Sequence, residues 1–242
     1  MSSLQILVIS MKHSLDRQKK VISEMNKTNL RWCFLEAVDG TQIDTKKIPY
    51  IPQKVNQLLG FELTPKELGC YLSHFEAWKA CVHENLPTLI FEDDFVVGDN
   101  FEESLSILLS NPDDWDLVRL QALWNSADVP IREYGSINLV RNLGDPLGAT
   151  AYLLNPLAAE KLIAHSSEIY EPVDHFIEHV EKHGLQILAV KPYPITVSDP
   201  TRATSTITDR PERAPIRGLA KFKRSIYRLI DRTFSDNPYF PK

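Results

Sequence analysis

Cysteine pairs, glycine-rich phosphate loops and long apolar runs are all missing from this 242-residue sequence. Its three cysteines, Cys33, Cys70 and Cys81, form no CxxC or other zinc-binding pattern. An odd number of thiols with apolar or aromatic neighbours argues against a disulfide framework. It favours buried, reduced side chains in a reducing compartment.

No segment approaches the roughly 20 apolar residues that a membrane-spanning helix needs. The first ten residues lack a basic stretch, and their apolar run is too short for a secretory signal. We therefore expect a cytoplasmic protein, unless another feature holds it at a membrane surface.

Without a GxGxxG or P-loop pattern, a phosphate site in this chain would not be built from a glycine-rich loop. The net charge of −5 argues against a general nucleic-acid binder. The 43% of hydrophobic residues is ordinary for a globular protein, so we expect a substantial core. The length suits one large domain, or one domain with a tail.

The first 40 residues predict a strand–helix–strand unit. Residues 4–10 and 31–37 have the apolar character of strands, and residues 14–29 suit a helix with Ser14 as its N-cap. This order is typical of a parallel α/β sheet with a nucleotide-sized crevice.

The strongest helix signal begins at Thr64. A capping threonine, Pro65 at the first helical position and Glu67 as the partner of the cap predict a helix that runs to about Asn85. Before it, residues 41–62 read as a poorly periodic loop. Beyond it we expect helices over 101–109, 156–164 and 173–182, strands over 115–120, 147–154 and 185–190, a hairpin within 127–140 and a loop over 200–215.

Residues 86–95, with the sequence LPTLIFEDDF, combine a buried strand with Glu92, Asp93 and Asp94. Open α/β sheets place ligands where such strands end. Adjacent carboxylates repel one another unless a cation neutralises them, and Mg²⁺ and Mn²⁺ prefer carboxylate oxygens. The stretch therefore predicts a metal–diphosphate site, with a solvated acidic turn as the alternative. On an extended chain Glu92 and Asp94 would share one face; if the chain has turned, Asp93 and Asp94 could both contribute.

The sequence resembles glycosyltransferase family 25, which includes bacterial lipopolysaccharide and lipooligosaccharide glycosyltransferases and collagen galactosyltransferases. The similar stretches follow in the right order over roughly residues 4–207. They are VISMK at 8–12 with Asp16-Arg17, EAVDG at 36–40, ELGCYLSHFEAW at 67–78, IFEDD at 90–94, GATAYLL at 148–154 and PVDHF at 172–176.

The resemblance implies a GT-A type α/β fold, with a mainly parallel central sheet flanked by helices, over residues 1–207. It also implies an inverting mechanism, a UDP-hexose donor and a divalent ion, Mn²⁺ or Mg²⁺, at the acidic motif. Glu92 and Asp94 are the expected metal ligands. Because the motif is Glu-Asp-Asp rather than a strict Asp-x-Asp, which two acids bind the ion stays open.

Inverting transfer needs a general base within reach of the acceptor hydroxyl. Asp174 is our candidate; its alternative role is that of an acid favouring a helix N-terminus. His74 would contact the donor or metal, or else be a satisfied core histidine. His175 would orient the acceptor or face solvent.

The remaining candidates concern the sugar nucleotide. Val38, Asp39 and Gly40 would contact uracil or ribose, or simply form a turn. Arg17 would bind diphosphate oxygens, as arginines do bidentately, or be an ordinary surface arginine. Asp93 is assigned to the same donor site.

Residues 208–242 depart from the acidic average. The stretch 211–232 holds seven Lys or Arg residues against two acids, with apolar residues at helical period. A basic amphipathic helix is typical of a membrane-surface element. The alternative is a helix packed on the body with a solvated basic face.

Together these observations predict an inverting, metal-dependent transferase that moves galactose from UDP-galactose to a lipooligosaccharide core sugar. It would act in the cytoplasm, peripherally on the inner face of the bacterial inner membrane, on a lipid-linked oligosaccharide and without nucleic acid. The alternatives are a UDP-glucose-dependent enzyme, a non-catalytic sugar-nucleotide-binding protein, and a metal-dependent phosphoesterase. The phosphoesterase would need ligands for a second ion, and no spacing of that kind is visible.

Overall fold

The computed structural model describes residues 4–198. The expected loop at 200–215, the boundary near residue 207 and the basic segment at 208–242 lie outside these described residues. Within residues 4–198, none of the helices has the length and apolar character needed to span a bilayer.

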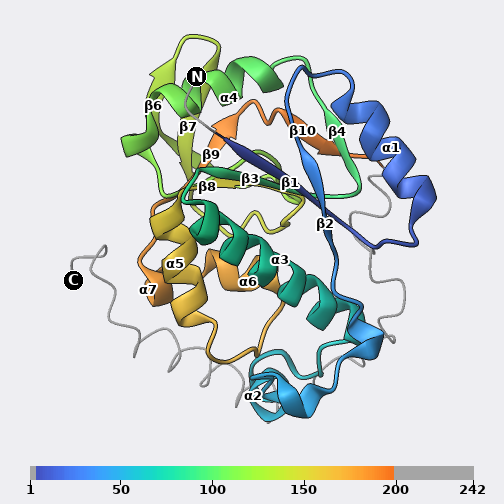
Figure 1. Cartoon of the computed structure of the whole chain (residues 1–242). Coiled ribbons are helices and arrows are strands. Elements are labelled where there is room, and N and C mark those ends of the chain that lie inside the picture. Colours follow the sequence, from blue (N-terminus) through green and yellow to red (C-terminus); the bar gives the residue numbers. More distant parts are fainter. Residues whose placement is uncertain (1–3, 199–242) are drawn as a thin grey trace, which may run out of the picture.

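An eight-stranded mixed sheet forms the centre of the protein (Figure 1). Strands β2, β1 and β3 are parallel to one another, β8 runs antiparallel to both β3 and β5, and β5 is parallel to β9. Across the sheet the order is β2 (Cys33–Glu36), β1 (Gln5–Ser10), β3 (Thr88–Glu92), β8 (Ala151–Leu154), β5 (Leu117–Arg119), β9 (Ile187–Lys191), β7 (Ile137–Asn142) and β6 (Asp128–Tyr134).

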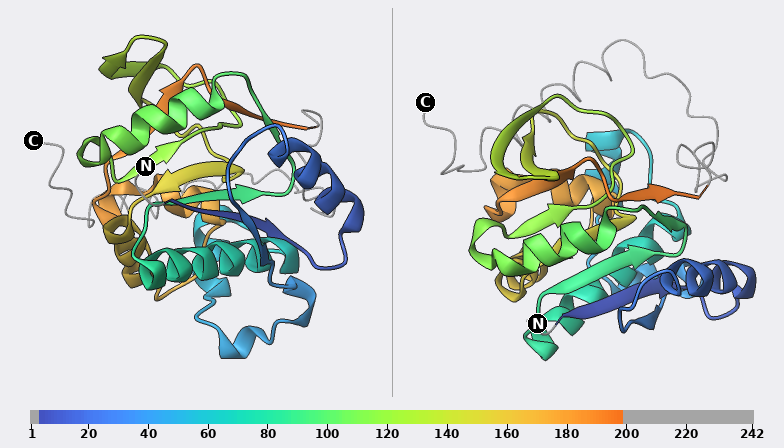
Figure 2. Two further views of the ribbon diagram at one scale, coloured as in Figure 1. Left: turned by 45° about the horizontal axis from the view of Figure 1, so that its top comes forward. Right: turned by 90° about the horizontal axis from the view of Figure 1, so that it is seen from above.

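Helices cover the sheet from both sides (Figure 1 and Figure 2). One core contains side chains from α2, α3, α5 and α6. The other contains side chains from α1, α4 and a small ribbon made by β4 and β10. The bounds are α1 (Leu15–Met25), α2 (Pro52–Leu59), α3 (Pro65–Glu84), β4 (Phe95–Val97), α4 (Phe101–Ser110), α5 (Pro156–His165), α6 (Val173–Glu178), α7 (Val180–His183) and β10 (Ile195–Val197), with 3₁₀ turns at Gly40–Gln42, Thr45–Lys47 and Pro112–Asp114.

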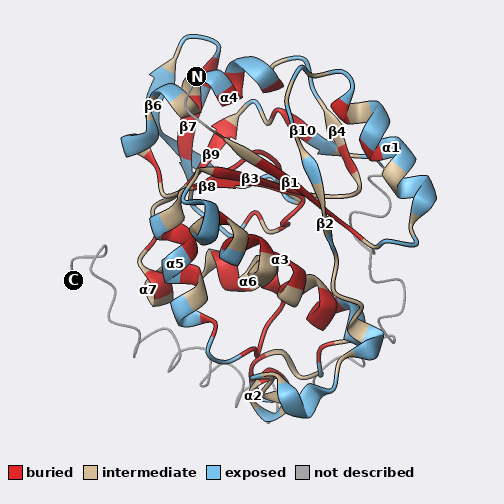
Figure 3. Ribbon diagram, in the orientation of Figure 1, coloured by how far each residue is buried: buried red, intermediate tan, exposed pale blue. Residues whose placement is uncertain are grey.

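The strands supply both cores because successive side chains point to opposite faces. In β1, Ile6 and Val8 face the core with α1 and α4, whereas Leu7 and Ile9 face the core with α3. Most of the sheet is consequently buried (Figure 3). A sheet with helices on both faces is the expected α/β architecture, and it is consistent with a GT-A type fold.

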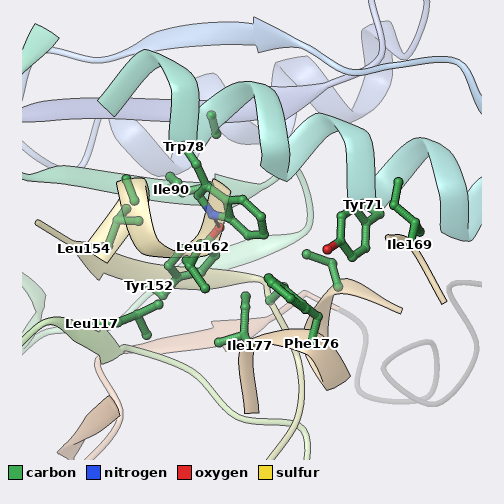
Figure 4. Packing of buried hydrophobic residues seen from close by; sticks show 14 of the residues in the cluster. Tyr71, Trp78, Ile90, Leu117, Tyr152, Leu154, Leu162, Ile169, Phe176 and Ile177 are labelled. Carbon is green, nitrogen blue, oxygen red and sulfur yellow. Dashed lines mark hydrogen bonds between the residues drawn. The ribbon is translucent and has the colours of Figure 1, made fainter. Parts of the chain in front are cut away.

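Helix α3 begins as the sequence predicts. The Thr64 hydroxyl oxygen accepts a hydrogen bond from the Glu67 backbone N–H, and Glu67 accepts one in return from the Thr64 N–H. The helix then buries Tyr71 and Trp78 against Phe176 of α6, with ring centroids 5.6 and 5.9 Å from it (Figure 4). This packing holds α6 and α3 on the same face of the sheet.

Several expected boundaries are wrong. Residues 41–62 are not a plain loop, because Pro52 starts the short helix α2 and Gly60 ends it in the left-handed conformation. The strand expected from Leu147 begins only at Ala151, since Leu147 and Gly148 have φ of 53° and 86°, which an extended strand does not allow.

Three further expectations are corrected near the two ends of the described chain. The helix expected over 173–182 divides at His179, whose ψ of 63° is not helical. The strand expected over 185–190 is β9 (Ile187–Lys191), and a further strand that was not expected, β10, follows it. Ser14 lies at the N-cap of α1, but its side chain makes no capping hydrogen bond.

The cysteines are free, as expected, but not all are buried. Cys81 is buried and Cys70 is half-buried. Cys33 is exposed, because it lies on β2 at the edge of the sheet.

Candidate active site

A cleft of about 820 Å³ opens where β2, β1 and β3 end. Its volume falls within the roughly 300–1,000 Å³ of typical small-molecule pockets. The loop before β8, the loop after β5, the start of α6 and one face of α3 complete its walls.

All the site residues expected from the sequence line this one cleft. They come from α1, the loop after β2, α3, the turn after β3 and α6, and they are Arg17, Val38, Asp39, Gly40, His74, Glu92, Asp93, Asp94 and Asp174, with His175 beside them. Segments up to 157 residues apart in the sequence therefore meet at the carboxylates.

Asp93 lies in the turn after β3 and faces the end of β1 and the first turn of α1. It accepts a hydrogen bond of 2.8 Å from the Ser10 hydroxyl and one of 2.7 Å from the Arg17 guanidinium. Burial would lower the pKa of Arg17, but Asp93 outweighs that effect and raises it. Asp93 thereby fixes the half-exposed guanidinium of Arg17 in the lining of the cleft.

Glu92, the last residue of β3, is held by three side chains. Its Oε1 accepts hydrogen bonds from Cys70 at 3.4 Å and His74 at 3.3 Å, and its Oε2 accepts one from the Thr150 hydroxyl at 3.3 Å. Burial alone would raise the pKa of Glu92, but these hydrogen bonds outweigh it and lower the pKa. Glu92 is therefore ionised and oriented.

A buried chain of polar groups lies behind His74. The Trp78 indole N–H donates to the Tyr152 hydroxyl at 2.8 Å, and that hydroxyl is 2.8 Å from His74 Nδ1 (Figure 4 shows Trp78 and Tyr152). Every group is satisfied if Tyr152 donates to Nδ1 and the Nε2–H of a neutral His74 donates to Glu92. His74 is thus a fully buried core residue that also contacts the cleft.

Asp94 differs from its two neighbours. Its Oδ1 is buried and has no hydrogen-bond partner among residues 4–198. Burial and the nearby carboxylates of Glu92 and Asp93 raise the pKa of Asp94 to about 7. A buried, unpartnered carboxylate oxygen is costly unless a ligand completes its coordination.

These observations fit a divalent cation. Asp93 uses both oxygens on Ser10 and Arg17, whereas Asp94 Oδ1 and the second lone pair of Glu92 Oε2 are available. Hard carboxylate oxygens suit Mg²⁺ and Mn²⁺. The Asp93 side chain is only 10% exposed and Asp94 Oδ1 is buried, which favours the metal site over the solvated turn considered as its alternative.

Cys70, His74 and Glu92 also place their ligand atoms within 4.8 Å of one another. Burial and Glu92 raise the pKa of the Cys70 thiol well above its usual range, so the thiol keeps its proton. In the arrangement described above, His74 Nε2 also carries a proton. These two side chains therefore act as hydrogen-bond donors to Glu92.

The other end of the cleft is built by close contact between α3 and the loop after β2. A Cβ atom on Gly69 would lie 2.6 Å from the Val38 carbonyl oxygen, so only glycine fits there. The Val38 N–H donates to the Ser73 hydroxyl at 2.8 Å. Asp39 caps the following turn by accepting two hydrogen bonds from Thr41, which lower its pKa.

Asp174 lies in the first turn of α6 and also lines the cleft. Its Oδ2 is 3.4 Å from the Gly148 N–H, and its Oδ1 accepts from the His175 N–H at 3.0 Å. Behind this contact the buried Arg119 donates to the Gly148 carbonyl and forms an ion pair of 2.6 Å with Glu178. The loop beside Asp174 is therefore held from within the protein.

Sequence reasoning missed the residues that orient the carboxylates: Ser10, Cys70, Thr150 and Tyr152. All four lie inside the stretches that resemble the family, and this resemblance was the signal that could have identified them. It also missed Trp124, a half-exposed side chain at the cleft wall with no motif around it.

Comparison with known proteins places this geometry in a family. The family model described as glycosyltransferase family 25 (LPS biosynthesis protein) matches residues 3–177. Lipooligosaccharide biosynthesis protein lic2B of Haemophilus influenzae is 27% identical over 173 residues, 65% of this chain and 62% of that protein. Procollagen galactosyltransferase 1-A of Xenopus laevis is 28% identical over 197 residues, 76% of this chain and 32% of that protein. Inactive glycosyltransferase 25 family member 3 of Homo sapiens is 28% identical over 184 residues, 72% of this chain and 31% of that protein.

The chain spans less than two thirds of the length of each of these relatives. The family match nevertheless covers every cleft residue from Arg17 to Asp174. The resemblance seen in the sequence is thereby confirmed, and the chain belongs to glycosyltransferase family 25.

Proposed function

We propose that this protein is an inverting, metal-dependent hexosyltransferase that moves galactose from UDP-galactose to a lipooligosaccharide core sugar. The observation that carries the proposal is the buried Oδ1 of Asp94, which has no partner in the part of the chain that the structure describes, beside an oriented Glu92. This pair of acids suits a divalent ion in a cleft large enough for a sugar nucleotide.

Glu92 and Asp94 would hold Mn²⁺ or Mg²⁺. When bound, such an ion neutralises the charge that develops on the UDP leaving group. His74, Cys70 and Thr150 keep Glu92 ionised and correctly turned for this role.

Arg17 would contribute to the diphosphate site, because a guanidinium binds phosphate oxygens bidentately. Asp93 holds that guanidinium in place. The loop of Val38, Asp39 and Gly40, fixed against α3, would contact uridine.

Asp174 is our candidate for the general base. It lines the same cleft as Arg17, and the Gly148 N–H and the backbone of its own helix orient its oxygens. A carboxylate so oriented is available to accept the proton of an acceptor hydroxyl during attack on the sugar.

The names of relatives support the substrates proposed. A lipooligosaccharide biosynthesis protein and a procollagen galactosyltransferase are both similar to this chain. UDP-glucose stays the alternative donor, because it differs from UDP-galactose only in the orientation of one hydroxyl. The similarity to a relative named inactive favours one other candidate, a sugar-nucleotide-binding protein without turnover.

UDP release from a panel of UDP-sugars tests the proposal without knowledge of the acceptor. We would compare wild type, Asp94→Ala and the surface control Asp113→Ala, each with Mn²⁺ and with EDTA. We expect metal-dependent release from UDP-galactose, at least tenfold lower in Asp94→Ala since removal of a carboxylate ligand weakens the metal site, and unchanged in the control.

Other outcomes discriminate among the alternatives. Release from UDP-glucose alone would change the donor. UDP binding without release, even after addition of truncated lipooligosaccharide, would favour the binding protein. Failure of UDP to bind at all would overturn the proposal.

We also propose that the basic segment at 211–232 holds the enzyme at the cytoplasmic face of the inner membrane, where a lipid-linked acceptor would be found. The support is its sequence: seven basic residues with apolar residues at helical period. Each basic residue near an anionic surface contributes on the order of 1 kcal/mol.

A further inference from the structure

The strand order divides the cleft into two sides. The ends of β2 and β1, which bear Asp39 and precede Arg17, lie on one side of the carboxylates after β3. On the other side come the loop before β8 and the loop after β5. Since neighbouring strands lie about 4.8 Å apart, β5 is roughly 10 Å from β3. The cleft therefore extends from the acids over the loops that adjoin β8 and β5.

Trp124 lines this second side and is 52% exposed. The contrast with Trp78 and Trp115, which are 0% and 2% exposed, shows that its ring is not part of a core. A large aromatic side chain left exposed in a cleft is typical of a ligand-binding surface.

The backbone beneath this ring is fixed. The Trp124 N–H donates to the Pro146 carbonyl at 3.0 Å, and the Leu123 N–H donates to the Leu147 carbonyl at 3.3 Å. Leu147 has a φ of 53°, a conformation that a leucine adopts only where its surroundings impose it. The buried Arg119, bonded to the Gly148 carbonyl, is one such constraint.

The same short segment also contacts Asp174. Pro146 anchors Trp124, and Gly148, two residues later, donates its N–H toward Asp174 Oδ2. Two residues span at most about 7 Å of extended chain. The backbone of Trp124 and the carboxylate of Asp174 therefore contact two ends of one short segment, and both residues line the cleft.

An aromatic face beside a carboxylate suits a pyranose, whose C–H groups pack on the ring while its hydroxyls bind the acid. We propose that Trp124 is the platform on which the acceptor hexose stacks, with its nucleophilic hydroxyl directed at Asp174. This inference rests on the proposed function and names the acceptor side of the same cleft.

The test uses Trp124→Ala, Trp124→Phe and a control, Leu157→Ala, whose side chain is 66% exposed on α5 and does not line the cleft. The acceptor probe is deacylated lipooligosaccharide core oligosaccharide. We expect its KM to rise about threefold to tenfold in Trp124→Ala and to stay within twofold of wild type in Trp124→Phe, since a ring of similar face is kept. The Kd for UDP should change in neither variant.

A direct binding measurement separates this inference from the proposed function. Titration of wild type with the oligosaccharide should quench tryptophan fluorescence, and Trp124→Phe should lose the change. If wild type releases no UDP from any UDP-sugar but the quenching persists, the proposed function fails and the sugar platform stands.

Two results would overturn the platform itself. One is an acceptor KM within twofold of wild type in Trp124→Ala, together with fluorescence quenching that survives in Trp124→Phe. The other is a dimer that dissociates in Trp124→Ala while oligosaccharide binding is unchanged, which would make the exposed ring a contact between two copies of the chain.

Discussion

At the scale of single residues, the three adjacent acids have been given three different environments. Asp93 is paired with Arg17, Glu92 accepts three hydrogen bonds, and Asp94 keeps a buried oxygen without a described partner. If hydrogen bonds and ion pairs satisfied all three carboxylates, no oxygen would remain to bind a cation. If they satisfied none, repulsion among the three charges would destabilise the turn whenever the cation was absent. The distribution leaves a site that is oriented and still open.

Tyr152 affects the orientation of Glu92 indirectly, because its hydroxyl bonds His74 and His74 in turn bonds Glu92. In Tyr152→Phe the Trp78 N–H and His74 Nδ1 would both lose their partner inside the core. We expect the free energy of unfolding to fall by about 2–6 kcal/mol, because two buried groups lose their partner and each costs about 1–3 kcal/mol. Urea unfolding followed by circular dichroism measures this.

Tyr71→Phe is the matched control, because Tyr71 is as buried as Tyr152 but has one neutral hydrogen-bond partner, Ser166. Ser166 also donates to the Leu162 carbonyl and stays partly satisfied. The control should lose only about 1 kcal/mol. Equal losses in the two variants would mean that the Trp78–Tyr152–His74 chain contributes no more than an ordinary hydrogen bond.

At the scale of secondary-structure elements, α3 and the loop after β2 act as one unit. Gly69 lets the helix approach the loop, and Ser73 then joins them by donating to the Gly69 carbonyl and accepting from the Val38 N–H. The proposed uridine contacts depend on this approach, since they lie on the loop rather than on a strand.

Gly69→Ala tests the close contact between α3 and the loop after β2, because helix propensity and steric overlap change the stability in opposite directions. In a helix, alanine is more favourable than glycine by about 1 kcal/mol, so propensity alone would stabilise the protein. The new Cβ would instead lie 2.6 Å from the Val38 carbonyl oxygen, and overpacking of this kind costs about 1–3 kcal/mol. We expect no net gain in the thermal midpoint and a weaker affinity for UDP by calorimetry.

Gly144→Ala is a suitable comparison, because its nearest neighbour would be the Ser126 hydroxyl at 3.3 Å and it does not line the cleft. It should change the free energy of unfolding by no more than about 0.5 kcal/mol. A Gly69→Ala protein that is more stable than wild type and binds UDP normally would contradict the tight contact.

The end of α7 gives the fold a pH dependence. Burial lowers the pKa of His183 from 6.5 to about 4, while its ring accepts from the Leu185 N–H and contacts the Ile177 carbonyl. In the unfolded chain His183 gains a proton below about pH 6.5, but in the folded chain only near pH 4. Above pH 6.5 the lowered pKa of His183 therefore contributes roughly 3 kcal/mol to the free energy of unfolding. This contribution is lost as the pH falls toward 4.

His183→Gln removes this titration and keeps a donor and an acceptor. We expect the stability gap between wild type and the variant to shrink by roughly 3 kcal/mol between pH 7 and pH 4 in urea unfolding. Carboxylate titrations are common to both proteins and cancel in the difference. A gap that does not depend on pH would show that the pKa of His183 is the same in the folded and the unfolded chain.

At the scale of the whole molecule, the acidic body and the basic segment at 211–232 have opposite charge. The full chain should sediment with vesicles containing anionic lipid, less so as salt rises, because exposed charges are screened. Neutralisation of Lys221, Lys223, Arg224 and Arg228 to Gln should weaken binding at least tenfold, at about 1 kcal/mol per residue.

The control for that experiment neutralises four exposed lysines of the body, Lys19, Lys20, Lys46 and Lys47. If this control weakens vesicle binding as much as the change in the basic segment, total charge rather than the segment is responsible. Equal binding by all three proteins would refute the proposed membrane contact.

The sequence allowed the elements with local signals to be predicted. The start of α3 followed from Thr64 and Glu67, and the acidic turn followed from the apolar run before it. Helix α2 was missed because, in eight residues, only Val55 and Leu58 are buried, too few for a visible period.

Features imposed by tertiary contacts could not be predicted. Nothing in the residue type marks Leu147 as left-handed, since its conformation follows from the loop that holds it. The partners of Glu92 come from α3 and from the loop just before β8, and a linear pattern does not show that these meet. Family resemblance selected the right stretches, but only the fold shows which atoms lie together.

The antiparallel strand β8 lies between β3 and β5. Its position also determines how much of the chain must be synthesised before the cleft can form. The pairing of β2, β1 and β3 needs only residues up to 92, whereas Thr88 must find Leu154 and Leu117 must find Ile187. Such long-range pairings form slowly, because the entropy of closing the intervening loops must be overcome first. A ribosome-bound chain that has reached the acids therefore still lacks 11 of the 31 residues that line the cleft, and the cleft is completed only after β10, which bears Val197, has been made.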